Sequence, residues 1–322
     1  MDWLTIFLPG LSEPVEICFD PEGVAHARAR TPAGAFHAQG YLHARDRLWQ
    51  MDYDRHRAYG RWAEWVGAAG VAQDRLMRRL RLGPTSRADY DHLKPETRAM
   101  LDAFSDGVNG FLASAGSLPP EYQLLGVEPE RWEPWDCLAV FKVRHVAMGL
   151  WETKLWRARL LRAVGPEAVA KLYRGNQPGE RVMLPPDGTY SGRVGDALAE
   201  LQTAMEALFW LQEADGGSNS WVVAGPLTRS GKPLLAGDPH RAPDVPSPYY
   251  PNHIACHAFD VTGLSFPGVP GFPHFGHNER VAWCITHTGA DAQDLFVERF
   301  DPENPSRYLF QGQWREAEQH RE

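Results

Sequence analysis

The sequence of 322 residues is 43% hydrophobic and 23% charged, which excludes a wholly disordered chain and a collagen-like one. Its length corresponds to roughly two domains or one large domain. Lys and Arg number 33 against 41 Asp and Glu, and the resulting net charge of −8 argues against nucleic acid as a partner.

The N-terminal residues contain no positively charged segment followed by a long apolar one, so we expect no signal peptide and, for the chain as written, a cytoplasmic location. No run of about 18 apolar residues occurs, and we expect no membrane partner. The four cysteines are far apart and form no CxxC pair, which argues against a zinc ribbon and a thioredoxin motif. Buried free thiols are favoured over disulfides.

The first half of the chain is expected to be mainly helical. Residues 15–19 alternate as a strand does, with 24–28 as a partner after a turn. Apolar residues at helical spacing then predict three long helices, which cover residues 34–60, 95–113 and 136–163.

The pattern changes in the second half. Residues 178–195 are rich in Gly, Pro and charge and are typical of a linker, and 196–213 form an amphipathic helical pattern. Short strand patterns follow, with a tight turn after the last one; they cover residues 220–224, 233–236, 253–259, 280–286, 295–299 and 307–310. We therefore expect an α+β chain with a helix-rich first half and a strand-rich second half.

The junction between the two halves carries a Gly217-Ser218 peptide, directly before a strand pattern. If this bond is cut, Ser218 gains a free α-amine, whose pKa near 7.7–8 makes it a base at neutral pH. Nucleophile and base then belong to one residue. A simple Gly-Gly-Ser turn is the other interpretation of these residues.

Three blocks of sequence resemble the penicillin acylase family of N-terminal nucleophile hydrolases. They cover residues 40–51 with 60–64, 217–223 with 230–240, and 267–268 with 275–294. The resemblance implies a four-layer αββα fold and extends over nearly the whole chain. It also implies a precursor that cuts itself at Gly217-Ser218 and becomes an αβ heterodimer.

The resemblance assigns residues 1–184 to the α-chain, 185–217 to a spacer and 218–322 to the first part of the β-chain. It makes Ser218 the nucleophile, His240 the side chain that orients it, and the backbone N–H of His287 one oxyanion donor. The second donor is an Asn beyond these residues, so we expect a fold and an active site that are incomplete at the C-terminus. The positions that match the acyl pocket are Met148, Arg241 and Ile285.

The same resemblance raises the question of a structural calcium ion, although the chemistry itself requires no cofactor. Asp291, Asp294 and the carbonyl of Gln293 match family calcium ligands. The matching α-chain position holds Lys154, which cannot bind calcium. Either the Lys154 ammonium replaces the ion, or a local shift lets Glu152 act as the ligand.

The resemblance implies an amidohydrolase that acts on a small N-acyl substrate, such as a penicillin, an acyl-homoserine lactone or a lipopeptide. One alternative is a truncated or inactive relative that binds or assembles without catalysis. Another is a metallohydrolase built from histidines, namely His253, His257, His274 and His277. Because family members are often exported, a periplasmic or secreted location also stays open.

Overall fold

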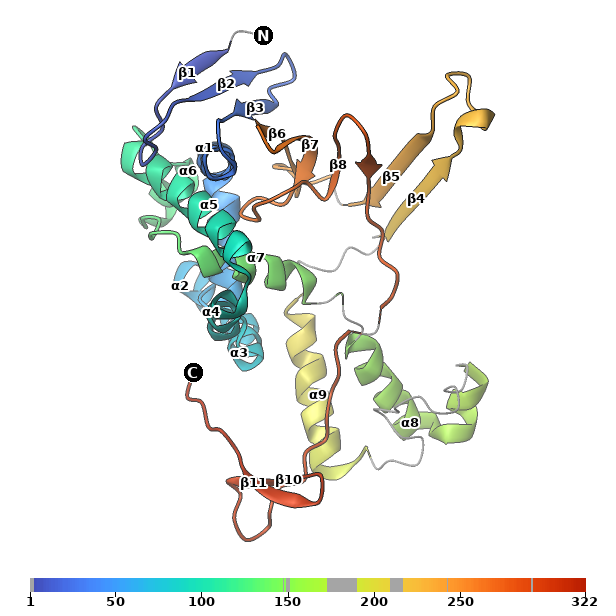
Figure 1. Cartoon of the computed structure of the whole chain (residues 1–322). Coiled ribbons are helices and arrows are strands. Elements are labelled where there is room, and N and C mark those ends of the chain that lie inside the picture. Colours follow the sequence, from blue (N-terminus) through green and yellow to red (C-terminus); the bar gives the residue numbers. More distant parts are fainter. Residues whose placement is uncertain are drawn as a thin grey trace. The chain divides into compact units, whose positions relative to one another are not determined.

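The computed structural model describes residues 3–146, 148, 151–172, 190–208, 217–241, 243–290 and 292–322. The chain forms two compact units, each built from two stretches of sequence. The first unit contains Met1–Val146 and Trp210–Thr288, and the second contains Ala147–Phe209 and Gly289–Glu322. Helices dominate the first half and strands the second, which confirms the α+β prediction (Figure 1).

The first unit contains a layer of helices. Helix α1 begins after Thr31, whose hydroxyl accepts the N–H of Gly34 at 3.1 Å, and Pro32 suits its first turn. Helix α7 begins with a reciprocal capping box between Glu133 and Asp136. The helices are α1 (Pro32–Ala58), α2 (Ala63–Val66), α3 (Val71–Leu80), α4 (Leu82–His92), α5 (Pro95–Ser114), α6 (Pro120–Leu125) and α7 (Pro134–His145), with a 3₁₀ turn at Gly67–Gly70.

Strands from both ends of the unit form one seven-stranded sheet with the order β1-β2-β3-β6-β7-β8-β9. Strands β3 and β6 are parallel, with His26 opposite His253, and the other neighbours are antiparallel. The N-terminal strands therefore complete a sheet whose other strands come after residue 249. The strands are β1 (Leu4–Ile6), β2 (Val15–Phe19), β3 (Ala25–Arg28), β6 (Tyr250–Cys256), β7 (Phe259–Ser265), β8 (Phe275–His277) and β9 (Ala282–Trp283).

Helices α1 and α5 approach each other closely at two glycines. A Cβ atom on Gly40 would lie 2.0 Å from the carbonyl oxygen of Phe104, and one on Gly107 would lie 2.0 Å from that of His37. The two backbones therefore touch, and the larger side chains along the same helices meet around this contact. The resulting core contains Leu48, Met51, Phe104, Val108 and Trp132.

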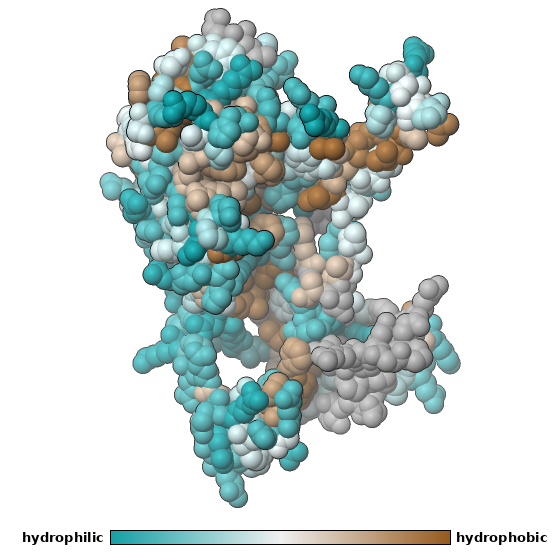
Figure 2. Space-filling model, in the orientation of Figure 1, coloured by the Kyte–Doolittle hydropathy of each residue, from teal (hydrophilic) through white to brown (hydrophobic). Residues whose placement is uncertain are grey.

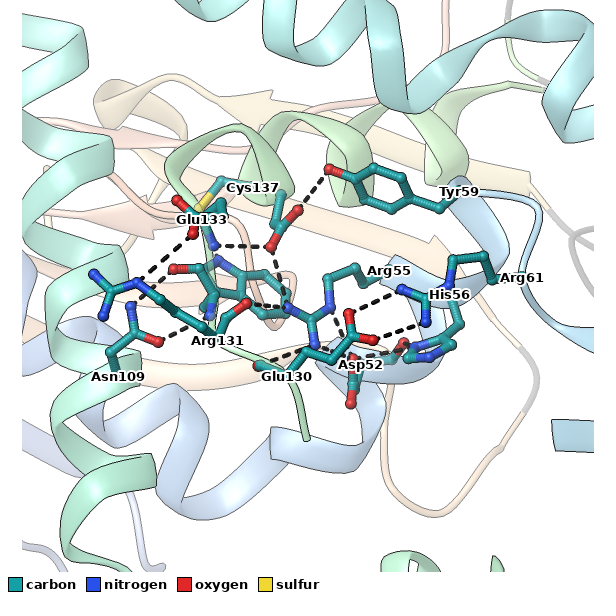
Figure 3. Close-up of polar contacts among 12 residues, drawn as sticks. Asp52, Arg55, His56, Tyr59, Arg61, Asn109, Glu130, Arg131, Glu133 and Cys137 are labelled. Carbon is teal, nitrogen blue, oxygen red and sulfur yellow. Dashed lines mark hydrogen bonds and ion pairs between the residues drawn. The ribbon is translucent and has the colours of Figure 1, made fainter. Parts of the chain in front are cut away.

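A buried ion cluster joins α1 to the segment before α7 (Figure 3). The guanidinium of Arg55 pairs with Asp52 at 2.6 Å and with Asp136 at 3.1 Å, and it donates to the carbonyl oxygens of Glu130 and Arg131. A buried arginine is costly unless its charge and its N–H groups are satisfied. Here five donor contacts satisfy it, since Nε also donates to Asp52.

Two tyrosines complete the cluster. Tyr122 donates to Asp52 at 2.9 Å, and Tyr59 donates to Asp136 at 2.6 Å. Each carboxylate thus has a second donor besides Arg55. The cluster ties the last two turns of α1 to α6 and α7.

Strands β4 (Gly217–Val223) and β5 (Leu234–His240) form a separate antiparallel hairpin, joined through a 3₁₀ turn at Gly225–Leu227 (Figure 1). Apolar side chains on this hairpin face solvent: Trp221 is 51% exposed, Val222 66% and Leu234 58%. Figure 2 shows hydrophobic surface over the hairpin.

The second unit contains α8 (Trp151–Leu172), α9 (Gly192–Glu206), β10 (Arg307–Phe310) and β11 (Gln313–Glu316). Buried Ala158, Leu161, Val169 and Tyr190 form its core. Strands β10 and β11 pair as an antiparallel hairpin, as the strand and turn pattern near residue 310 predicts. Helix α9 lies inside the predicted spacer.

Three predicted elements differ from the structure. The single helix over 136–163 is wrong: α7 ends at His145 and α8 begins at Trp151, and the sequence between them contains Gly149, a poor helix former. Residues 295–299 form no regular strand, because alternation alone does not supply a pairing partner. The strand predicted over 280–286 is confined to Ala282–Trp283. The predicted linker falls largely on residues 173–189, outside the described residues.

The remaining sequence expectations concern thiols and membranes. All four cysteines are thiols outside any disulfide; Cys18 and Cys137 are buried, whereas Cys256 and Cys284 are partly exposed. Among the residues that the structure describes, no helix has both the length and the apolar composition to cross a bilayer.

The α1–α5 contact predicts that one added methyl group at Gly40 lowers the stability of the protein strongly. We expect Gly40→Ala to destabilise the protein by about 1–3 kcal/mol or more, because its Cβ would overlap the α5 backbone and outweigh the better helix propensity of Ala. Gly116→Ala is the matched control, since a Cβ there meets nothing within 4 Å. Denaturant unfolding of both variants measures the difference; equal stabilities would contradict the close contact.

Candidate active site

Ser218 lies in β4 opposite Pro239 of β5. Its hydroxyl contacts a segment far along the chain: Oγ is 2.7 Å from Oγ1 of Thr286, and the backbone N–H of His287 donates to the same Oγ at 3.3 Å. The Thr286 hydroxyl also donates to the carbonyl oxygen of Ser218 at 3.2 Å. The structure therefore brings the predicted nucleophile and the predicted oxyanion donor together.

The segment that carries Thr286 is held against the hairpin two residues earlier. Cys284 Sγ lies 2.9 Å from Oγ of Ser220 and donates to the carbonyl oxygen of Ala236 at 3.7 Å. A Cβ on Gly237 would lie 2.6 Å from Cβ of Cys284. Glycine at this position of β5 is what lets the segment come so close.

His240 ends β5 and lies opposite Gly217 in the ladder. Its Nε2 is 3.1 Å from Nδ2 of Asn219 and 3.1 Å from Oδ2 of Asp238. The Ser218 hydroxyl instead contacts Thr286 and His287. In the intact chain, His240 is thus next to the peptide predicted to be cut, and its orienting role stays a prediction.

The three predicted pocket residues lie in different surroundings. Arg241 directly follows β5, and Ile285 is an exposed residue between Cys284 and Thr286. Both are therefore close in sequence to residues that contact Ser218 or Gly217. Met148 belongs to the second unit, so its part in an acyl pocket stays a prediction.

Of the predicted calcium ligands, Asp291 lies outside the described residues. The Lys154 ammonium donates to the carbonyl oxygen of Gln293 and pairs with the carboxylate of Asp294. Glu152 is partly buried, burial raises the pKa of its carboxyl, and Oε1 has no hydrogen-bond partner. A cation thus already contacts two of the predicted ligands, the Gln293 carbonyl and the Asp294 carboxylate, which a calcium ion at this place would have to share with it.

The histidines of the metallohydrolase alternative have separate partners. His253 contacts Asp260 and His26, and His257 contacts the Arg30 carbonyl. His274 packs against the ring of Phe266, and His277 contacts the Asn278 carbonyl. Burial lowers the pKa of His274 to about 4. No cluster of three or more His, Cys, Asp or Glu able to hold a metal occurs among the described residues, so the geometry gives this alternative no support.

The sequence block at 40–51 belongs to α1 and contacts the C-terminal part of the same unit. Nδ1 of His43 accepts the N–H of Gly268 at 3.3 Å. The hydroxyl of Tyr250 donates to Asp46 at 2.6 Å. This block therefore binds the segment around β6 rather than forming part of the site at Ser218.

One residue before this block, Gln39 makes the same kind of connection. Its amide donates to Oδ1 of Asn252 at 3.1 Å and to the carbonyl of Gly271 at 2.9 Å, and it accepts the N–H of Gly271 at 3.0 Å. The three partner atoms, which belong to Asn252 and Gly271, are buried together with the Gln39 amide. Polar side chains of α1 thus satisfy backbone groups of a loop more than 200 residues away.

Sequence reasoning missed Thr286 and Gln39. The available signal for Thr286 was its place directly before His287, the residue assigned as oxyanion donor. Gln39 directly precedes a recognised block but carries no motif of its own. Contacts across such distances in sequence have no local signature.

The first unit thus combines a layer of helices, a seven-stranded sheet and a separate hairpin whose strand β4 begins with the Gly217-Ser218 peptide. The sequence model of the penicillin amidase family matches residues 14–322. The chain belongs to this family.

Several characterised proteins are similar to this chain. The penicillin acylase 2 proenzyme of Pseudomonas sp. (strain SE83) is 45% identical over 92% of this chain and 39% of its own length. The acyl-homoserine lactone acylase QuiP of Pseudomonas aeruginosa is 31% identical over 98% of this chain and 38% of its own. The chain thus spans about two fifths of the length of these relatives.

A solved structure of a thermostable penicillin G acylase from Alcaligenes faecalis also aligns. It has a TM-score of 0.43 and 26% sequence identity, and the alignment covers 53% of this chain and 96% of that one.

The contact of His43 with Gly268 predicts that the stability of the fold decreases in acid. Burial and the nearby charge of Arg47 lower the pKa of His43 from 6.5 to about 3, so the folded state keeps this ring neutral. The unfolded chain binds the proton first, and this part of the stability is lost as pH falls from about 6.5 to about 3. His43→Asn keeps an acceptor near the position of Nδ1. We expect its melting temperature to fall less than that of the wild type between about pH 7 and about pH 4.5.

The control is His92→Asn, which changes an exposed histidine at the end of α4. This variant should lose as much melting temperature on acidification as the wild type. Equal losses in wild type and His43→Asn would contradict the role of the neutral ring.

Proposed function

We propose that the protein of which this chain forms part is an amidohydrolase that cuts itself at Gly217-Ser218 and then uses Ser218 as its nucleophile. The observation that carries this proposal is the surroundings of the Ser218 hydroxyl. Glycine precedes it in an open hairpin strand, and the N–H of His287 donates to its oxygen. A backbone N–H beside the nucleophile also lies next to the carbonyl group that the hydroxyl attacks, where a developing oxyanion requires a donor.

The first reaction is an acyl shift within the chain. Oγ of Ser218 attacks the carbonyl carbon of Gly217, the C–N bond breaks, and the hydroxyl proton ends on the nitrogen of Ser218. Water then hydrolyses the ester, which leaves a carboxylate on Gly217 and a free amine on Ser218. This amine is the base that the intact chain lacks.

In the second reaction the nucleophile acts on substrate. The α-amine takes the proton as Oγ attacks the substrate amide. The α-ammonium returns this proton to the leaving nitrogen, the amine product departs, and an acyl ester forms on Ser218. Water releases the acid and regenerates the hydroxyl. In both steps the N–H of His287, which donates to Oγ in the intact chain, turns to the oxyanion as the tetrahedral intermediate forms. The family resemblance assigns the second donor to an Asn beyond these residues.

The contacts inside the first unit support a heterodimer after cleavage. The parallel ladder of β3 with β6 joins segments on the two sides of the cut. The bonds of Gln39 and His43 to the loop around Gly268 do the same. Because these contacts do not pass through residue 217, breaking that peptide leaves them in place.

The names of the relatives support a substrate class. Penicillins and acyl-homoserine lactones share one feature, an acyl group joined through a secondary amide to a small ring. We infer that the substrate is an N-acyl compound of this kind. Arg241, next to His240, is compatible with a polar or carboxylated acyl group.

We also propose that the protein needs no calcium, because the Lys154 ammonium stands in for the ion. Its partners are the carbonyl of Gln293 and the carboxylate of Asp294. An ammonium supplies one charge and three donors, enough for a small set of oxygen atoms. The six to eight oxygens that calcium prefers would have to displace it.

Self-cleavage predicts two fragments in the intact mass of the full-length protein. The C-terminal fragment should begin at Ser218, and Ser218→Ala should remain a single chain, because it lacks the attacking oxygen. Ser230→Ala, an exposed serine in the turn of the same hairpin, is the matched control and should still be cut. A single chain from the wild type would support the alternative of a binding or assembly protein without catalysis.

The role of Lys154 predicts that chelators leave the melting temperature of the wild type unchanged. Lys154→Glu places a carboxylate beside Asp294 and the Gln293 carbonyl, and it should make the melting temperature rise with added calcium, by analogy with other oxygen sites. Lys171→Glu, an exposed charge reversal on the same helix, controls for charge alone. Calcium bound to the purified wild type in an elemental analysis would contradict the replacement.

A further inference from the structure

Proton counting fixes the direction of the hydrogen bonds around Ser218. Thr286 Oγ1 lies within bonding distance of two oxygens, Oγ of Ser218 at 2.7 Å and the Ser218 carbonyl at 3.2 Å. A carbonyl oxygen only accepts, and a hydroxyl has one hydrogen. The hydrogen of Thr286 therefore goes to the carbonyl, and the Thr286 oxygen accepts the hydrogen of the Ser218 hydroxyl.

The neighbouring residue completes the arrangement. The backbone N–H of His287 donates to Oγ of Ser218 at 3.3 Å. A serine oxygen has two lone pairs, so His287 uses one and the other remains for attack on a carbonyl carbon. Two consecutive residues thus hold the nucleophile, one through its hydrogen and one through its oxygen.

The segment that carries Thr286 is attached at a second point. Cys284 contacts Ser220 of β4 and the carbonyl of Ala236 in β5, and Gly237 leaves room for it. The distance between Thr286 and Ser218 therefore depends on packing of the segment against the hairpin, in addition to their own hydrogen bonds.

We propose that Thr286 is a positioning residue for the nucleophile, an inference that rests on the proposed function. Before the cut, it directs the Ser218 hydroxyl hydrogen and fixes the Ser218 carbonyl. After the cut, it keeps Oγ next to the N–H of His287 while the α-amine acts as the base. Thr286 itself gains and loses no proton, since a neutral hydroxyl is far too weak a base.

The variants that test this are Thr286→Val and Thr286→Ser in the full-length protein. Val keeps the shape and removes the hydroxyl, and Ser keeps the hydroxyl. We expect Thr286→Val to slow self-cleavage, followed by intact mass over time, about tenfold or more, and Thr286→Ser to cut at close to the wild-type rate. Processed Thr286→Val should show a similarly lowered kcat with an unchanged KM on penicillin G, because the lost contact does not involve the substrate.

The matched control is Thr288→Val, the same substitution two residues along at an exposed position. It should cut at the wild-type rate. A Thr286→Val protein that cuts as fast as the wild type would overturn the inference, and so would a Thr286→Ser protein as slow as Thr286→Val. If the wild type itself is never cut, both the proposed function and this inference fail. If the wild type is cut and Thr286→Val is cut equally fast, only the inference fails.

Discussion

The contact of the α1 and α5 backbones at Gly40 and Gly107 is the constraint on which the first unit depends. Without side chains at these two points, the helices touch and their larger residues enclose a common core. The contact also sets the position of α1. Gln39 of this helix bonds to Asn252 of β6, and Gln39 and His43 bond to the loop after β7 that contains Gly268 and Gly271. A well-packed core transmits such a constraint because it does not deform freely. The sheet built from both ends of the first unit thus depends on the absence of side chains at Gly40 and Gly107.

A second close approach organises the candidate site. Gly237 admits Cys284 to the hairpin, and this places Thr286 and His287 against Ser218. The site is therefore assembled from a hairpin and a segment with little regular structure. Function is often carried by irregular segments that a packed framework positions. Here the framework is the hairpin itself, and its ladder also sets His240 opposite Gly217.

Two cations in this protein are surrounded by oxygen atoms. Arg55 has two aspartates and two carbonyls, and Lys154 has a carbonyl and an aspartate. A buried charge without partners would destabilise the fold strongly, so each cation fits only with its complete set of acceptors. The planar guanidinium presents its donors in a fixed fork, whereas the compact ammonium is a point charge with three donors. The same electrostatic principle thus acts in both units by different chemistry.

The helix-first, strand-second order, the family and the Gly-Ser peptide could be predicted from the residues alone, because periodicity and short motifs are local properties of a chain. The family resemblance also pointed to His287 as a donor beside Ser218, and the structure brings the two residues together. Only the tertiary structure decided that Thr286 holds the Ser218 hydroxyl, that His240 bonds to Asn219 and Asp238, and that Gln39 reaches Gly271. These contacts join residues separated by as many as 232 positions. Packing brings such residues together, and no local pattern records it.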